Sequence, residues 1–252
     1  MPKLPIALQM YTLREDTDQD FAGTIRKVAD IGYAAVELAG YGGLSVQEVA
    51  GLLADNHLKV AGSHISLDTI EADVSKVIEE NLALSNTHIV VPYLGDDRRG
   101  TAADYEAVAA SLNKYGETLR ASGMTLCYHN HDFEFKPLED GRLGEDIILD
   151  GTDPIFVKAE VDSYWIMKAG HDPVAFIRKH SGRVPLLHLK DMDPEDKSFA
   201  PIGTGLLPLD ELIAAAGEIG TEYLIVEQDV CKGPALEAVT LSYNNLKAKG
   251  YA

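Results

Sequence analysis

The stretch VPLLHLKD, residues 184–191, is a short run of Val and Leu that ends in a histidine, a lysine and an aspartate. An apolar run of this length without polar alternation is typical of a buried parallel strand, because both faces of such a strand are covered. Side chains two positions apart on a strand share a face, so His188 and Lys190 are expected to project together. The stretch therefore predicts a parallel strand with polar groups at its carboxyl end.

Similar apolar runs recur along the chain, and amphipathic segments separate most of them. Several of these segments end on glycine, which readily adopts the left-handed conformation that terminates a helix. The expected strands are residues 5–11, 34–38, 59–65, 88–94, 125–130, 156–161, 184–189 and 222–227. The expected helices are residues 21–32, 46–57, 104–123, 172–182, 208–220 and 234–250.

This alternation predicts an α/β fold, a single (β/α)8 TIM barrel that spans residues 1–252 as one domain. The alternative is a doubly wound open sheet. Such a sheet would normally carry a glycine-rich phosphate turn after its first strand, and the segment QMYTLRED at 9–16 contains no glycine. No Pro/Ser-rich linker or low-complexity stretch divides the chain.

Composition narrows the classes of partner and compartment. The net charge of -18 argues against nucleic acid and anionic membrane surfaces as partners. The first residues show no basic segment followed by an apolar one, and no apolar span of membrane length occurs, so a soluble cytoplasmic protein is expected. Cys127 and Cys231 suggest no disulfide framework, and Cys127 is expected to be a buried residue of a strand.

Polar side chains gather where the expected strands end, which is the end of a TIM barrel that carries its chemistry. Burial of a carboxylate costs several kcal/mol unless it is paired or binds a cation. Three carboxylates and one imidazole in chain order, Glu134, Asp162, His188 and Glu227, therefore predict a site for one divalent ion, with Mn²⁺, Mg²⁺, Co²⁺ and Zn²⁺ all suited. Other polar and aromatic residues at these ends are Gln9, Tyr11, Glu37, His64, Tyr93, His129, Asn130, His131, Tyr164, Trp165, Lys190, Asp191 and Gln228.

At these positions the chain resembles the xylose isomerase-like TIM-barrel superfamily, in particular the sugar phosphate isomerase/epimerase group. The resemblance rests on LQMYTLRED (8–16), YHNHDFEF (128–135), VDSYW (161–165), LLHLKD (186–191), PIGTGLLPLDEL (201–212) and IVEQD (225–229). The arrangement HNHDFE is most similar to the branch of inosose dehydratases and enzymes that act on 3-keto sugars.

The resemblance implies how the ion would be held. In that superfamily the ligands are a glutamate after strand five, an aspartate after strand six, a histidine after strand seven and a glutamate after strand eight. These correspond to Glu134, Asp162, His188 and Glu227. Many members carry the strand-five glutamate inside the strand, where this chain has histidines, so the strand-five ligand is open between Glu134 and a neighbouring histidine.

The resemblance also implies an isomerase or epimerase that removes a proton next to a carbonyl of a keto-sugar or cyclitol. His131 is the expected base, whereas the epimerases would use Glu134 and Glu227. Residues expected to contact the small-molecule substrate are Gln9, His64, His129, Trp165 and Lys190. The alternatives are a lyase or dehydratase acting on inososes or 3-keto sugars, and a carbohydrate-binding barrel without activity. A homo-oligomer is compatible with the sequence.

Overall fold

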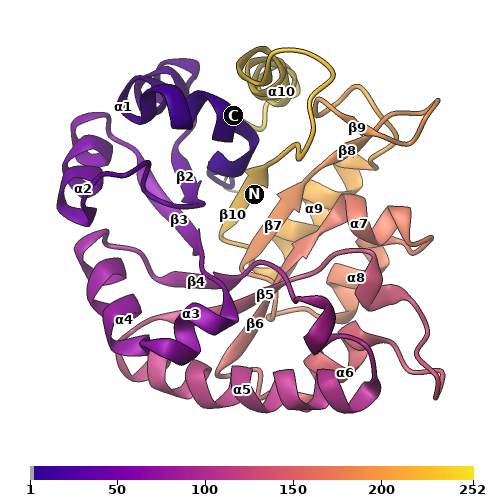
Figure 1. The fold of residues 1–252 in the computed structure, drawn as a ribbon. Coiled ribbons are helices and arrows are strands. Elements are labelled where there is room, and N and C mark those ends of the chain that lie inside the picture. Colours follow the sequence, from indigo (N-terminus) through magenta and orange to yellow (C-terminus); the bar gives the residue numbers. More distant parts are fainter. Residues whose placement is uncertain (1–2) are drawn as a thin grey trace.

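A computed structural model describes residues 3–252, and its centre is a closed barrel of eight parallel strands. The strands follow one another around the barrel, and helices surround them (Figure 1). The strands are β1 Ile6–Gln9, β2 Ala35–Leu38, β3 Lys59–His64, β4 His88–Val91, β5 Thr125–His129, β6 Val157–Asp162, β7 Leu186–Leu189 and β10 Tyr223–Val226. The eight expected strands and the barrel are thereby confirmed.

Each helix expected from the sequence is present, and several short elements appear in addition. The helices are α1 Arg14–Ile31, α2 Val46–Asp55, α3 Leu67–Ala72, α4 Val74–Ala83, α5 Ala102–Ala121, α6 Gly144–Gly151, α7 Ser163–Lys168, α8 Pro173–Lys179, α9 Leu209–Ile219 and α10 Ala235–Ala248. The 3₁₀ turns are η1 Met10–Leu13, η2 Asp96–Arg98 and η3 Phe133–Phe135, and a small antiparallel pair joins β8 Asp191–Met192 to β9 Phe199–Ala200. The helices α3, α4, α6 and α7 were not expected.

The first helix begins earlier than the sequence pattern indicated. It starts at Arg14 rather than at residue 21, but its backbone breaks at Asp20, where φ is -154° and ψ is 86°. The Asp20 side chain accepts a hydrogen bond from the Gly23 N–H at 2.8 Å, as a capping residue does. The periodic segment from residue 21 is therefore a separately capped stretch of α1, and its stop at Gly32 has the expected left-handed φ of 116°.

The barrel interior is layered, because inward-facing side chains recur every second residue. Its lower layer is small and apolar and consists of Ala7, Ala35, Ala61, Val90, Cys127, Leu186 and Ile225. Two residues further along five of these strands, on the same face, lie Gln9, Glu37, His129, His188 and Glu227. A layer of buried polar groups therefore sits directly above the apolar layer. Cys127 is fully buried, as expected.

Within residues 3–252, no helix has the length and apolar character needed to cross a membrane.

Candidate active site

The polar layer at the carboxyl ends of the strands is held together by His188 on β7. Its Nδ1 lies 2.8 Å from Glu227 Oε2, and its Nε2 lies 2.7 Å from Glu37 Oε2 and 3.2 Å from Glu160 Oε2. All four side chains are nearly or wholly inaccessible to solvent. Burial lowers the pKa of His188, but the carboxylates of Glu160 and Glu37 outweigh that effect and hold the pKa well above its usual value. The expected convergence of His188 and Glu227 at one mouth is confirmed.

Glu160 on β6 is a central member of this layer that the sequence reasoning missed. Its Oε2 lies 2.8 Å from His129 Nδ1 and 2.9 Å from His64 Nε2. A signal was present, because Glu160 is two residues before Asp162 and shares its inward face. An acidic side chain inside an apolar strand, on the face of a candidate ligand, indicates a second carboxylate of the same site.

Lys190, two residues after His188, brings a positive charge to the other side of the layer. Its Nζ lies 2.9 Å from Asp162 Oδ2, 2.7 Å from Glu227 Oε2 and 2.8 Å from Asp229 Oδ1. Burial lowers the pKa of Lys190, but these three carboxylates reverse the effect and raise it well above its usual value. Lys190 is therefore a buried ammonium whose three donors all face carboxylates.

Gln9 lies at the same end of the barrel but is fully buried and does not line the cavity described below. Its Nε2 donates to Glu37 Oε2 at 2.7 Å, and its Oε1 accepts from the Tyr11 N–H at 3.0 Å. The structure thus gives Gln9 a role in holding Glu37, whereas the sequence suggested contact with substrate.

Glu134, the expected strand-five ligand, lies in the turn η3 and is engaged elsewhere. Its Oε1 accepts from the Tyr128 hydroxyl at 2.6 Å, and its Oε2 accepts from the His131 N–H at 2.8 Å. Burial raises the pKa of Glu134 to about 7. The carboxylate therefore braces the segment after β5.

His131 extends from that segment among aromatic rings. Its ring stacks on Phe133 with centroids 5.5 Å apart, and it lies 5.3 Å from Trp165 and 5.4 Å from Tyr93. Its Nδ1 is buried without a hydrogen-bond partner among the described residues. Burial, followed by the nearby Lys190 ammonium, lowers the pKa of His131 to about 3, so the imidazole is neutral near pH 7.

Two sets of side chains come close enough to hold a metal ion. One consists of His129, Asp162, His188 and Glu227, and the other of His64, His129, Glu160 and His188; within each set the ligand atoms lie within 4.8 Å of one another. The first set contains three of the four expected ligands, with His129 in the place of Glu134. Two imidazoles and two carboxylates are a donor set that fits a divalent transition metal.

A cavity of about 610 Å³ opens above this layer. Its floor includes His64, His129, Lys190 and Glu227, and His131 also lines it. Its rim is aromatic and consists of Tyr11, Tyr93, Trp165 and Phe199. Four of the five residues expected to contact substrate, all but Gln9, thus line one cavity whose volume suits a small molecule.

The loop PIGTGLLP beside this cavity is held by Asp191. The Asp191 carboxylate accepts hydrogen bonds from the N–H groups of Gly203 and Gly205 at 2.9 Å and of Leu207 at 2.8 Å. A Cβ added at Gly205 would lie 2.4 Å from Asp191 Oδ1, so the carboxylate depends on that glycine. Because these backbone N–H groups already donate to the Asp191 carboxylate, the loop is a turn with a structural role.

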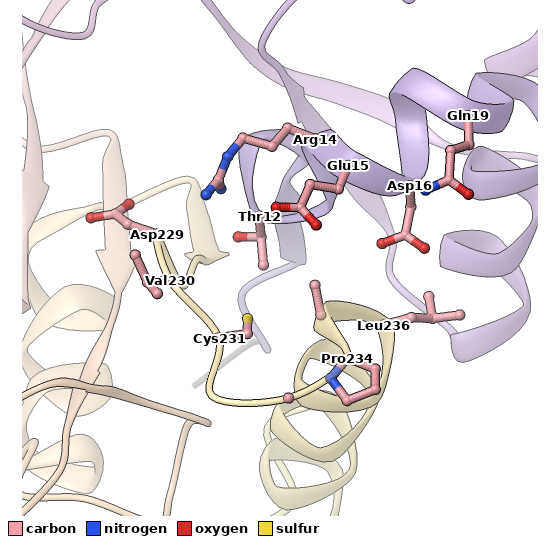
Figure 2. A pocket seen from close by; sticks show the side chains of 12 residues that line it. Thr12, Arg14, Glu15, Asp16, Gln19, Asp229, Val230, Cys231, Pro234 and Leu236 are labelled. Atoms are coloured by element: carbon pink, nitrogen blue, oxygen red, sulfur yellow. The ribbon is translucent and has the colours of Figure 1, made fainter.

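A second cleft of about 300 Å³ adjoins the mouth between the start of α1 and the segment that leads into α10 (Figure 2). It shares Asp229 and Val230 with the larger cavity. In Figure 2 the side chain of Arg14 extends into this cleft, and Cys231 lies on its far side. The Arg14 guanidinium also lies 4.4 Å from the centroid of the Tyr11 ring on the rim.

A family model described as "Xylose isomerase-like TIM barrel" matches residues 25–242. The chain belongs to this family. The family match covers most of the barrel, including the strands that carry Glu37, Asp162, His188 and Glu227.

Curated relatives are similar over parts of the chain. An inosose dehydratase of Mesomycoplasma hyopneumoniae is 31% identical over 105 residues, which are 41% of this chain and 34% of that protein. An inosose dehydratase of Lacticaseibacillus casei is 26% identical over 180 residues, which are 64% of this chain and 55% of that protein. The matched region thus spans between a third and somewhat over half of the length of these relatives.

A solved structure confirms the fold over the full chain. A sugar phosphate isomerase/epimerase from Parabacteroides distasonis superposes with a TM-score of 0.86 and 24% identity, covering 100% of this chain and 96% of that one.

Proposed function

We propose that this chain is a divalent-metal-dependent enzyme that removes a proton from the carbon next to a carbonyl of a keto-sugar or cyclitol. The observation that carries the proposal is the convergence of His129, Asp162, His188 and Glu227 beneath an aromatic-rimmed cavity. These four residues would hold the ion. When bound, a divalent ion supplies Lewis acidity that makes the proton beside a carbonyl easier to remove.

In this proposal the protein's own groups bind the sugar and move its proton. The faces of a sugar or cyclitol ring would rest against Trp165 and its aromatic neighbours. Lys190 would turn one of its three donors from Asp229 to a substrate oxygen. His131, whose neutral ring lines the cavity, would take the proton. His64 would contact the substrate from the opposite wall.

A lyase reaction on an inosose or 3-keto sugar is the form that one observation favours over epimerisation. The epimerases that the sequence resembles would use two glutamates, Glu134 and Glu227 in this chain. Here Glu134 is bonded to Tyr128 and to the His131 backbone, and among residues 3–252 Glu227 is the one glutamate that lines the cavity. A single glutamate with a histidine base fits proton removal followed by loss of a leaving group. The inosose dehydratase relatives support the same choice.

Proton exchange tests the proposal before any product is known. Purified protein would be analysed for metal and then incubated in D₂O with a panel of keto-sugars and inososes. We expect one ion per chain and deuterium at the carbon beside the carbonyl of at least one compound, lost on treatment with a chelator. Binding of ion and sugar without any exchange would favour the inactive carbohydrate-binding barrel and contradict the proposed enzyme.

The charges that line the cavity also bear on whether the substrate carries a phosphate group. Its lysine, Lys190, already faces three carboxylates, and the neighbouring loop donors face Asp191. A phosphate beside Glu227 and Asp229 would meet like charges, which disfavour binding. We therefore expect an unphosphorylated keto-sugar to bind at least about ten-fold more tightly than its phosphate ester.

Competition binding with both forms of one sugar would measure this difference. Asp229→Asn removes one of the repelling charges and should narrow the gap between the two affinities. A phosphate ester that binds more tightly than its parent sugar would contradict the expectation.

A further inference from the structure

Each of the two histidines proposed as ligands faces buried carboxylates at both ring nitrogens, one in the proposed ion site and one deeper in the barrel. His129 Nδ1 lies 2.8 Å from Glu160 Oε2, while its Nε2 faces Asp162 Oδ2 at 3.6 Å. His188 Nε2 lies 2.7 Å from Glu37 Oε2, while its Nδ1 faces Glu227 Oε2 at 2.8 Å. The nitrogen that faces the deeper glutamate is therefore Nδ1 in His129 and Nε2 in His188.

A carboxylate only accepts hydrogen bonds, so without an ion His188 would carry a proton on both of its nitrogens, because each faces a carboxylate. An ion bound beside Asp162 and Glu227 needs a lone pair from the nitrogen on its side, which leaves the remaining ring proton on the nitrogen that faces the deeper glutamate. In a neutral imidazole the other nitrogen then has a free lone pair. For His129 that nitrogen is Nε2, and for His188 it is Nδ1. Both lone pairs point toward Asp162 and Glu227, the two carboxylates of the proposed ion site.

The two glutamates belong to one connected layer. His64 Nε2 lies 3.1 Å from Glu37 Oε2 and 2.9 Å from Glu160 Oε2, so this ring lies between them. Gln9 holds Glu37 from behind, and a Cβ added at Gly62 would lie 2.5 Å from Glu37 Oε1. Glu37 is therefore held by Gln9 and His64, neither of which belongs to the proposed ion site, and Glu160 shares the contact with His64.

The second set of candidate ligands, His64, His129, Glu160 and His188, raises the alternative of another ion deeper in the barrel. An ion there would bind Nδ1 of His129 and Nε2 of His188, the two nitrogens that face Glu160. If both positions were filled, each of these rings would have to lose both its protons and bridge two ions. Metal ligands must be deprotonated, and two doubly deprotonated imidazoles make this arrangement unfavourable. The geometry therefore fits a single ion that lies above the layer formed by Glu37, Glu160 and His64.

We propose that Glu37 and Glu160 are positioning residues that fix opposite tautomers of the two histidine ligands. Glu160 holds the proton of His129 on Nδ1, and Glu37 holds the proton of His188 on Nε2. His64 joins the two carboxylates. This inference rests on the proposed function, because it assumes that His129 and His188 bind the ion. Loss of such a supporting carboxylate typically weakens metal binding roughly 10- to 100-fold.

Metal affinity provides the first test. The dissociation constant for Zn²⁺ would be measured by chelator competition on the whole chain, for wild type, Glu160→Gln and Glu37→Gln. Glu145→Gln is a matched control. Like Glu37 and Glu160, Glu145 is buried and has one carboxylate oxygen without a hydrogen-bond partner, but it lies on α6 outside this layer. We expect roughly 10- to 100-fold weaker binding in the two variants and unchanged binding in the control. Unchanged affinity in both variants would overturn the inference.

The tautomers can be read directly by nitrogen-15 NMR of the histidine rings of wild-type protein, so the test survives even if a variant fails to fold. Zinc-loaded protein should carry the proton of His129 on Nδ1 and that of His188 on Nε2. Metal-free protein should already show the Nδ1–H form of His129. The opposite tautomer at either ring, or a second tightly bound ion per chain, would contradict the inference. Absence of any bound ion would refute the proposed metal site, while the His129 tautomer in the same sample still decides whether Glu160 positions the ring.

Discussion

Replacing Asp162 by alanine should abolish binding of the divalent ion and reduce proton exchange to background, while the barrel remains folded. Asp162 is fully buried at the end of β6, and its Oδ2 lies 2.9 Å from Lys190 Nζ and 3.6 Å from His129 Nε2. Removal of one of two carboxylate ligands deprives the ion of a negative charge that a buried site cannot replace with solvent. His188→Ala should have the same effect.

Metal content after gel filtration, together with circular dichroism, would measure this result. Asp162 also accepts a hydrogen bond from the Trp165 N–H at the start of α7, so alanine removes a helix cap as well as a ligand. Asp162→Asn keeps a capping side chain, and loss of metal in this variant separates the two effects. Asp210→Ala, which removes an exposed aspartate paired with Lys249, should change neither property. Full metal occupancy in Asp162→Ala or His188→Ala would refute the assignment.

The location of the site followed from the sequence because strand periodicity is simple. Once 184–189 and 222–227 were assigned to parallel strands, His188 and Glu227 had to lie at the same end of the barrel. Glu160 lies two residues before the end of β6, so the pattern of polar groups at strand ends did not indicate it. The alternation from Glu160 to Asp162 was nonetheless sufficient to place both on the inner face.

The orientation of Glu134 could not be predicted in the same way. Its segment leaves β5 and forms the turn η3, which is set by contacts that no local pattern specifies. The hydroxyl of Tyr128 and the backbone of His131 take both carboxylate oxygens. Proximity in sequence to the end of β5 was therefore a poor guide to which side chain faces the proposed ion, and His129, on the strand itself, is the better placed.

The short helices were missed for a related reason. The helix α3 has six residues and α4 has ten, and they meet at Asp73, which ends one and caps the other. The break at Asp73 interrupts the apolar period, so no single helical pattern runs through residues 67–83, whereas α2, which also has ten residues, follows the capping residue Ser45 and was predicted. The long helices α5 and α10 carried a clear pattern and were predicted.

Exchange of His131 for glutamine should leave the ion bound and lower proton exchange into substrate by about 10²-fold or more, the usual scale for loss of a general base. His131 lines the cavity, and its ring is neutral near pH 7, so it keeps a lone pair that can take a proton from a bound substrate. The low pKa of about 3 reflects burial first and the Lys190 charge second, so the proton would be held only while substrate is bound.

The alternative role for His131 is structural, since its backbone N–H donates to Glu134 and its ring stacks on Phe133. Glutamine preserves the backbone donor and most of the side-chain volume, so a purely structural role predicts exchange close to wild type. Phe133→Leu is a matched control, because it removes the stacked ring but leaves the imidazole. Metal content, sugar affinity and exchange rate would be measured for all three proteins. A fall in exchange confined to His131→Gln, with metal and affinity retained, would identify His131 as the base, whereas wild-type exchange would transfer that role to Glu227, the glutamate that already lines the cavity.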